Sequence, residues 1–339
     1  AVAWAAGAGK LRPGVVGWAF AALITVDQWT VLSRYWQFSG RATTLFRADA
    51  TIDYVKAQTA AAPARVLPLP FGDGLERHDA MVSGDGLMVH RIRSVLGYHG
   101  NELARWQRLY DKDGGLQNIV NPNFLQLANV RWILSGAADL SQIPFPGGAP
   151  RLVAGPVRNA SGSMVYLHEL NLSAPFAWVA PVIVKAGDEA ALQTVLDPRF
   201  PLASVALVDS AAPVQGVSNL AGPPPTLDLP VRVTKYEPGA IDLDLGTAAP
   251  AGSALVVSEN FYPGWTATVD GKATTTVRTQ YSLIGVPLAA GAKTVSLRFA
   301  SAPYEQGKSI TLVALALALL LLVGGVVAER GRPVADVRA

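Results

Sequence analysis

Cysteine is absent from all 339 residues of the chain. This absence excludes disulfide bonds, thiolate catalysis, Fe–S clusters, covalently attached c-type haem and zinc sites with cysteine ligands. Histidine is also rare, and neither apolar end of the chain contains one, so there is no axial ligand for an intramembrane haem or chlorophyll. We therefore expect no bound cofactor. The four histidines are His78, His90, His99 and His168.

Charged residues are scarce as well. They make up 16% of the chain, against 50% hydrophobic residues, and the net charge is only +3. The lysines and arginines are scattered rather than gathered in one stripe, which excludes a nucleic-acid partner. The apolar excess lies at the two ends, whereas the middle is rich in Gly, Pro, Val, Thr and Asp. The composition predicts membrane-spanning ends and a folded domain between them.

The C-terminal apolar run predicts a transmembrane helix over residues 309–328. Its uninterrupted part, Ile310 to Ala328, covers roughly the ~30 Å hydrocarbon core at ~1.5 Å per residue. Lys308 precedes the run, and a more basic tail over residues 329–339 follows it. By the positive-inside rule the tail is cytoplasmic and the middle of the chain is exported. The basic residues of the tail are Arg330, Arg332 and Arg338.

The N-terminal segment, residues 1–36, predicts a second transmembrane helix. Val15 to Val26 is apolar, and Pro13 before it suits a helix start. Residues 1–9 are apolar and lack an initiator Met, so we interpret them as the stub of a preceding helix in a longer polypeptide. Two basic residues before the run again place the N-terminal end in the cytoplasm; they are Lys10 and Arg12.

The outer end of this N-terminal helix predicts contacts with the membrane interface. Asp27 interrupts the apolar pattern there, and aromatic residues around it form a predicted interfacial belt. A carboxylate inside a membrane is a functional candidate, but Asp27 lies near the interface, where a solvated helix end is the favoured explanation. The belt residues are Trp29, Tyr35 and Trp36.

The first exported region, residues 43–142, predicts a mixed α/β layer because helical and strand patterns alternate. The predicted helices are 50–62, 101–110 with Asn101 as its cap, and 122–128. The predicted strands are 65–69, 88–95 and 130–134.

A Pro/Gly stretch, IPFPGGAP, separates this layer from a second exported region over residues 151–300. Short strands with turn residues between them predict an antiparallel β-sandwich. The sharpest signal is Asp270-Gly271 between two alternating strands, which is typical of a type I′ hairpin. The predicted fold class is therefore a membrane-anchored α+β protein with two transmembrane helices flanking a mixed α/β layer and a sandwich. The predicted strands are 151–153, 164–170, 176–184, 205–208, 231–236, 240–245, 254–259, 266–269, 274–277, 281–286 and 294–299.

Two segments of the second region resemble a known family. SENFYPGWTATVDGK and VPLAAGAKTVSLRF, followed by a Tyr-x-x-Gly step into the closing apolar helix, resemble the C-terminal end of YfhO-like bacterial membrane proteins. HRIRSVLGYHGNELARW and LANVRWIL resemble the region after that family's last-but-one helix, and Asp27 matches a position that is often acidic there.

The resemblance implies a relationship to polytopic GT-C-type glycosyltransferases, some of which decorate cell-wall polymers with sugars from lipid-linked donors. Their catalytic carboxylates lie in an early exported loop that has no counterpart in this sequence. No catalytic residue is therefore carried over, and the resemblance favours a non-catalytic chain over an enzyme.

Three groups of side chains are candidate sites. A loop cluster of acidic residues and one histidine suits a divalent cation chemically, but it matches no EF-hand or HExxH spacing, so we expect a solvated loop and no metal site. A second group around His99 suits sugar binding or acid/base chemistry, although strand alternation and helix capping also explain it. Aromatic residues of the second region suit a sugar platform or a protein interface. The three groups are Asp73, Glu76, His78, Asp79 and Asp85; His90, Tyr98, His99, Asn101 and Glu102; and Phe261, Tyr262, Trp265 and Tyr281.

No Gly-x-Ser-x-Gly elbow, complete phosphate-binding loop or Gly-x-Gly-x-x-Gly motif occurs. We therefore predict a non-catalytic accessory or structural subunit of the bacterial inner membrane, with a periplasmic domain that packs against other integral membrane proteins. A multi-subunit energy-converting complex is one setting for it. Two alternatives stay open: a C-terminal fragment of a YfhO-like glycosyltransferase acting on cell-envelope polymers, and a glycan-binding module. The expected partners are the lipid bilayer, other membrane proteins and, under the last alternative, a glycan.

Overall fold

The computed structural model describes residues 7–8, 13–36, 40–60, 62–97, 100 and 102–330. It divides into two compact units, residues 1–47 and residues 48–339. Several predicted features lie outside the described residues: most of the stub at 1–9, the residues Lys10, Arg12, Tyr98, His99 and Asn101, and the basic tail from 331 onward.

The first unit contains the helices α2 (Pro13–Leu32) and α3 (Ala42–Leu45). α2 begins at the predicted proline, whose fixed φ suits the first helical position. Among the predicted belt residues, the rings of Trp29 and Trp36 meet edge to face with their centroids 4.8 Å apart. Tyr35 is 77% exposed. The belt itself stays a prediction.

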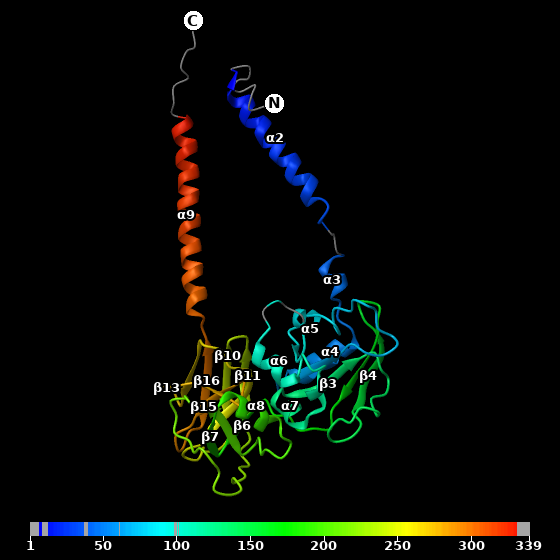
Figure 1. Ribbon diagram of the computed structural model, residues 1–339, viewed down its shortest axis with the longest axis vertical. Helices are drawn as coiled ribbons and strands as arrows, with labels where there is room; N and C mark the ends of the chain where they lie inside the picture. Colours follow the sequence, from blue (N-terminus) through cyan, green and yellow to red (C-terminus); the bar gives the residue numbers. More distant parts are fainter. Residues whose placement is uncertain are drawn as a thin grey trace. The chain divides into compact units, whose positions relative to one another are not determined.

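The second unit opens with a five-stranded sheet in the order β2-β1-β3-β5-β4. β1 runs parallel to β2 and β3, whereas β5 is antiparallel to β3 and β4. β4 and β5 follow the Pro/Gly stretch in sequence, so this sheet continues past the stretch that we expected to separate two regions (Figure 1). The strands are β1 (Arg65–Leu69), β2 (Arg93–Ser94), β3 (Val130–Ser135), β4 (Arg151–Arg158) and β5 (Met164–Glu169).

Short helices accompany this sheet, and their starts follow from capping residues. Asp49 caps α4 by accepting hydrogen bonds from two backbone amides, and Asn121 caps α7 in the same way. The strand predicted over residues 88–95 is wrong: residues 86–89 form a helical turn and Arg91 has a left-handed φ of 58°. Only Arg93–Ser94 then pairs with β1. The helices are α4 (Ala50–Thr59), α5 (Gly86–Val89), α6 (Ala104–Tyr110), η1 (Gln117–Val120) and α7 (Pro122–Leu127).

The second sheet has six strands in the order β6-β11-β15-β14-β8-β7. It corrects the prediction of purely antiparallel pairing, because β7 and β8 are parallel. The helix α8 (Asp188–Leu196), which the sequence patterns did not predict, connects these two strands and makes the parallel pairing feasible. The strands are β6 (Ala177–Ala180), β7 (Val182–Ala186), β8 (Val205–Asp209), β11 (Ala254–Asn260), β14 (Val277–Thr279) and β15 (Leu283–Pro287).

The third sheet has five strands, β13-β12-β16-β10-β9, and every pair in it is antiparallel. The predicted hairpin is confirmed: β12 pairs with β13 across Asp270 and Gly271, whose φ angles of 49° and 77° are both positive. The strands are β9 (Arg232–Glu237), β10 (Ala240–Asp244), β12 (Trp265–Val269), β13 (Lys272–Thr274) and β16 (Thr294–Phe299).

The second sheet is buried on both faces. In β6, Trp178 and Ala180 belong to a core cluster shared with α7 and the first sheet, whereas Ala177 and Val179 belong to a cluster shared with the third sheet. β11 divides its side chains between the two clusters in the same alternating way. Burial on both faces explains why these strands read as continuous apolar runs.

The long helix α9 (Ala302–Arg330) follows β16. Together with Val15–Leu32 in α2, its residues Ala302–Gly325 are long and apolar enough to cross a membrane, by length and composition. The described residues between 48 and 301 form a body of three sheets, whose packing positions the site described next.

Candidate functional site

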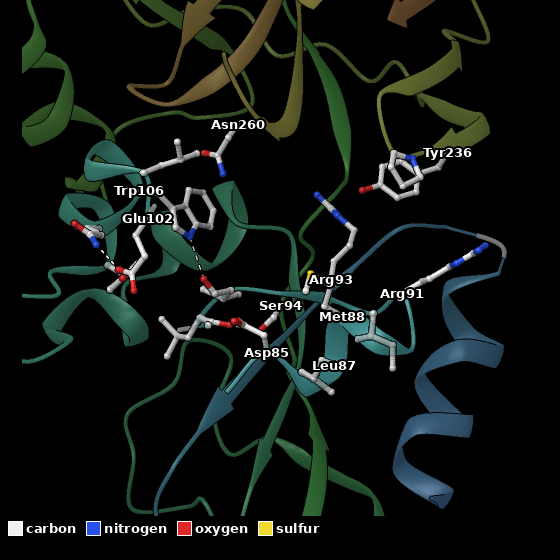
Figure 2. Close-up of a pocket in the computed structure, with 18 of the residues that line it drawn as sticks. Asp85, Leu87, Met88, Arg91, Arg93, Ser94, Glu102, Trp106, Tyr236 and Asn260 are labelled. Carbon is white, nitrogen blue, oxygen red and sulfur yellow. Dashed lines mark hydrogen bonds between the residues drawn. The ribbon is translucent and has the colours of Figure 1, made fainter. Parts of the chain in front are cut away.

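A cavity of about 610 Å³ lies between the α5–β2–α6 segment and the turn that joins β9 to β10. Its volume is within the range of ligand pockets, ~300–1,000 Å³. Figure 2 shows Trp106 from α6 and Glu102, which precedes that helix, on one side and Arg93 with Tyr236 on the other. Its lining residues include Asp85, Leu87, Met88, Arg91, Arg93, Ser94, Glu102, Leu103, Trp106, Gln107, Tyr110, Tyr236, Glu237, Pro238 and Asn260.

One wall of the cavity is formed by Arg93 and the residues around it. The guanidinium lies 4.9 Å from the ring centroid of Phe176 and 5.3 Å from that of Tyr236, and the two rings meet edge to face. Its Nη2 donates to the Ser258 carbonyl at 2.6 Å and to Glu259 Oε2 at 3.2 Å. Because cation–π contacts and hydrogen bonds act together, Arg93 is held in one orientation beside the cavity.

Arg65 pairs with the same Glu259 carboxylate as Arg93 and is 4% exposed. Its Nη1 donates to the Ala128 carbonyl at 2.9 Å and to Ser258 Oγ at 2.8 Å, and its Nη2 lies 3.5 Å from Glu259 Oε1. Burial, together with the nearby charge of Arg93, lowers the pKa of Arg65 to about 9. Arg65 therefore stays charged at neutral pH, and its charge requires the Glu259 carboxylate as a partner.

Glu259 joins the two arginines to the third sheet, because it also accepts a hydrogen bond from the Tyr236 hydroxyl at 3.2 Å. Burial disfavours its ionised form, but Arg93 and Arg65 more than offset that effect and hold the pKa of this carboxyl below its usual range. The same arrangement raises the pKa of Tyr236, through burial first and the Glu259 charge second.

The opposite wall comes from α6. Trp106 donates from Nε1 to the Val95 carbonyl at 3.0 Å, and its ring lies 5.3 Å from the Arg65 guanidinium. Burial, followed by the Glu102 charge, raises the pKa of Tyr110 to about 12, so this phenol stays protonated. Glu102 itself accepts hydrogen bonds from Gln107 and Lys112. Both walls are therefore fixed by their own contacts before any ligand enters.

Aromatic rings together with amide, carboxylate and guanidinium groups give the cavity the chemistry to hold a neutral, hydroxyl-rich ligand. The rings offer apolar faces, and the planar polar groups offer paired donors and acceptors. Within the described part of the chain, no group of three or more His, Cys, Asp or Glu residues is arranged to hold a metal ion.

The structure separates the members of the predicted aromatic platform. Tyr262 is 52% exposed, and it contacts Phe299 at a centroid distance of 6.3 Å; Trp265 is half-buried against the same ring at 5.4 Å. Tyr281 instead is 2% exposed, with the guanidinium of Arg105 5.2 Å from its ring centroid. These contacts place Tyr281 in the core rather than on a ligand-facing surface.

Two members of the predicted acidic cluster have separate roles in the structure. Asp79 is 1% exposed, its Oδ1 accepts from the backbone amides of Met81 and Val82, and its Oδ2 accepts from Asn159 at 2.5 Å. Asp85 lines the cavity instead. The sequence patterns did not identify Arg93, Trp106 and Tyr236 as site residues. These residues lie on β2, α6 and β9, three elements that only the fold brings together.

The comparisons with known proteins were made on the whole chain. No match was found among curated proteins or among solved structures. A scan against family models matched residues 228–311, which run from the segment before β9 into α9 and contribute Tyr236, Glu237, Pro238 and Asn260 to the cavity. Residues 228–311 of this chain are therefore similar to the family whose model is described as bacterial membrane protein YfhO.

Proposed function

We propose that this chain is the non-catalytic binding part of a YfhO-like membrane protein, and that its three-sheet body holds a glycan of the cell envelope in the cavity. The observation that carries the proposal is the cavity itself, with rings and planar polar groups on two walls, one held by the Arg93–Glu259–Tyr236 contacts and the other by the Trp106–Val95 hydrogen bond. The family match and two apolar helices suggest a membrane location.

The proposal includes a location and a topology. The body lies on the periplasmic side of a bacterial inner membrane, with the C-terminal tail in the cytoplasm, on the strength of the basic residues next to the apolar runs. Since the chain lacks cysteine, the variants Gly271→Cys and Ala339→Cys test this without background labelling. An impermeant thiol reagent added to intact cells should label only the first, and labelling of only the second would contradict the topology.

The architecture of the body belongs to the same proposal. The second and third sheets share one buried cluster that contains Ile241, Leu255, Ile284 and Leu297. Side chains from both sheets meeting in one core support the β-sandwich expected from the strand pattern.

Binding is tested with the full chain in detergent micelles and oligosaccharides released from bacterial cell envelopes, by isothermal titration calorimetry. Asn260→Ala removes a cavity amide whose Oδ1 accepts from Ser282 at 2.8 Å. The loss of about one hydrogen bond, ~0.5–1.5 kcal/mol, predicts roughly two- to tenfold weaker binding. Asn171→Ala, which removes an exposed amide outside the cavity that donates to the Ala149 carbonyl, should leave the affinity unchanged. Failure of every envelope oligosaccharide to bind the unmodified chain would contradict the proposal.

A second candidate function is that of an accessory subunit which braces other integral membrane proteins. It is favoured by exposed apolar side chains in the segments that form the cavity: Met88 is 70% exposed, Val89 56% and Leu103 38%. Flexible, exposed methionine suits adaptable protein contacts. Purification from native membranes should then recover a stoichiometric partner, which the variant Met88→Lys/Val89→Lys loses. Recovery of a lone chain would argue against this candidate.

The transferase alternative makes a separate prediction. If the sequence is the end of a YfhO-like glycosyltransferase that acts on cell-envelope polymers, the reading frame continues upstream of Ala1 through further apolar spans of ~20 residues each. In that case the cavity would hold the acceptor polymer, and the calorimetric experiment above would give the same result.

A further inference from the structure

The third sheet ends at the point where the apolar helix begins. β16 is hydrogen-bonded through its last residues, since the amide of Phe299 donates to Gly239 at 2.9 Å and that of Ala300 donates to Gly264 at 3.0 Å. α9 starts at Ala302. Ala300 and Ser301 are thus the two residues between the strand and the helix.

Strand register defines which residues share this end of the sheet. Trp265 at the start of β12 pairs with Phe299, and Ala240 at the start of β10 pairs with Arg298. At the opposite end, Val269 pairs with Val295 beside the Asp270-Gly271 turn. One end of the sheet therefore adjoins α9, and the hairpin lies at the other.

Aromatic side chains gather at the end that adjoins α9. Phe299 contacts both Tyr262 and Trp265. We call these three residues the sheet-end aromatic cluster. Tyr262 and Phe299 are 52% and 37% exposed, and Tyr304 in the first turn of α9 is 65% exposed. Rings with one polar atom, like those of Tyr and Trp, favour the boundary between hydrocarbon and water.

The length of α9 decides where this cluster lies relative to a bilayer. Its 29 residues extend over roughly 43 Å at ~1.5 Å per residue. A bilayer including its headgroups is ~40–45 Å thick. If α9 crosses the bilayer with its C-terminal end at one headgroup surface, its first residue, Ala302, lies at the other headgroup surface. Ala300, the last residue hydrogen-bonded to the sheet, is two positions before Ala302.

We propose that the sheet-end aromatic cluster is a contact surface for the phospholipid headgroup region, which seats the three-sheet body directly on the bilayer. This goes beyond glycan binding and rests on the proposed membrane anchoring. Tyr236, Glu237 and Pro238 of the cavity wall lie at the same end of the sheet, so the cavity then opens close to the membrane surface.

The test uses single cysteines in the cysteine-free chain, each labelled with an environment-sensitive fluorophore and reconstituted into phosphatidylcholine vesicles. Tyr262→Cys and the exposed neighbour Pro263→Cys report on the cluster, and the second variant keeps all of its rings. Lys272→Cys in β13 reports on the opposite end of the sheet, and Leu320→Cys reports on the insertion of α9.

Nitroxide-labelled lipids, with the nitroxide at the headgroup or deep in the acyl chain, serve as quenchers. We expect headgroup nitroxide to remove most of the fluorescence at positions 262 and 263 and little at 272, and deep nitroxide to quench position 320. Quenching at 320 without quenching at 262 and 263 overturns the contact surface while leaving the anchoring intact. Equal quenching at 263 and 272 also overturns it, and absence of quenching at 320 overturns both the anchoring and this inference.

Discussion

The Nη2 atom of Arg93 on β2 lies 3.2 Å from the Oε2 atom of Glu259 on β11. This contact crosses from the first sheet to the second, at a place where the Arg93 side chain is 12% exposed and the Glu259 side chain 24%. Arg65 approaches the other carboxylate oxygen of Glu259. One carboxylate thus offsets two buried cations, and this arrangement determines the first two predictions.

Glu259→Gln should lower the unfolding free energy of the full chain in detergent by about 2–3 kcal/mol. The glutamine keeps the shape but leaves Arg65 and Arg93 buried without a counter-charge; the loss is below the ~3–5 kcal/mol of a fully buried pair because Glu259 retains some exposure. Chemical denaturation followed by circular dichroism measures it. The control Glu237→Gln breaks a surface pair with Lys235 and should cost below about 1 kcal/mol. Equal effects of the two variants would contradict the prediction.

The contribution of Glu259 should also depend on pH. Its folded-state pKa is lowered, so the unfolded chain binds this proton more tightly and the ionised carboxylate stabilises the fold above the ordinary glutamate pKa of ~4.3. That stability is lost as the pH falls through the folded-state pKa. The difference in Tm between the wild-type chain and Glu259→Gln should stay constant from about pH 7 to 5 and shrink below about 4.3. A difference that grows towards acid pH would refute this assignment.

Tyr281→Ala should destabilise the fold by about 3–5 kcal/mol, because it empties a buried aromatic position. Tyr281→Phe should cost only ~1 kcal/mol, since it removes the hydroxyl that accepts from Arg108 at 3.0 Å. Tyr262→Ala, at a half-exposed position of the predicted platform, serves as the control and should change stability by below about 1 kcal/mol. Thermal unfolding in detergent ranks the stability of the three variants. A loss of stability in Tyr281→Ala as small as that in Tyr262→Ala would contradict the core role of Tyr281.

Gly264→Ala should loosen the end of the third sheet. Gly264 has a φ of 120°, and an added Cβ would come within 2.4 Å of the Ala300 carbonyl oxygen. Strain of this kind costs ~1–3 kcal/mol before the clash is relieved. Gly271→Ala meets nothing within 4 Å at a φ of 77°, so it should cost only ~1–2 kcal/mol. If hydrogen exchange at the Ala300 amide is no faster in Gly264→Ala than in Gly271→Ala, the proposed role of this glycine is wrong.

Local patterns in the sequence predicted most elements that depend on neighbouring residues. The strand Arg65–Leu69 was predicted with the bounds it has, the helix predicted from residue 122 begins there as α7, and Asp270-Gly271 turns the hairpin. These features depend on φ/ψ preferences and on hydrogen bonds that close within a few residues. The strand predicted over residues 88–95 was wrong for an equally local reason. The apolar alternation there did not reveal the left-handed backbone conformation of Arg91.

The sequence by itself determined the two apolar helices, the lack of cysteine chemistry, the strand-rich composition of the body and the YfhO-like end at residues 228–311. The tertiary structure alone decided that β4 and β5 join the first sheet, that α8 carries a parallel crossover, and that Tyr281 is buried. The cavity also exists only in the tertiary structure, because its lining residues come from separate segments of the chain. Arg65 and Glu259 are 194 positions apart, and pairing over such a separation depends on the packing free energy of whole sheets, which no local pattern records.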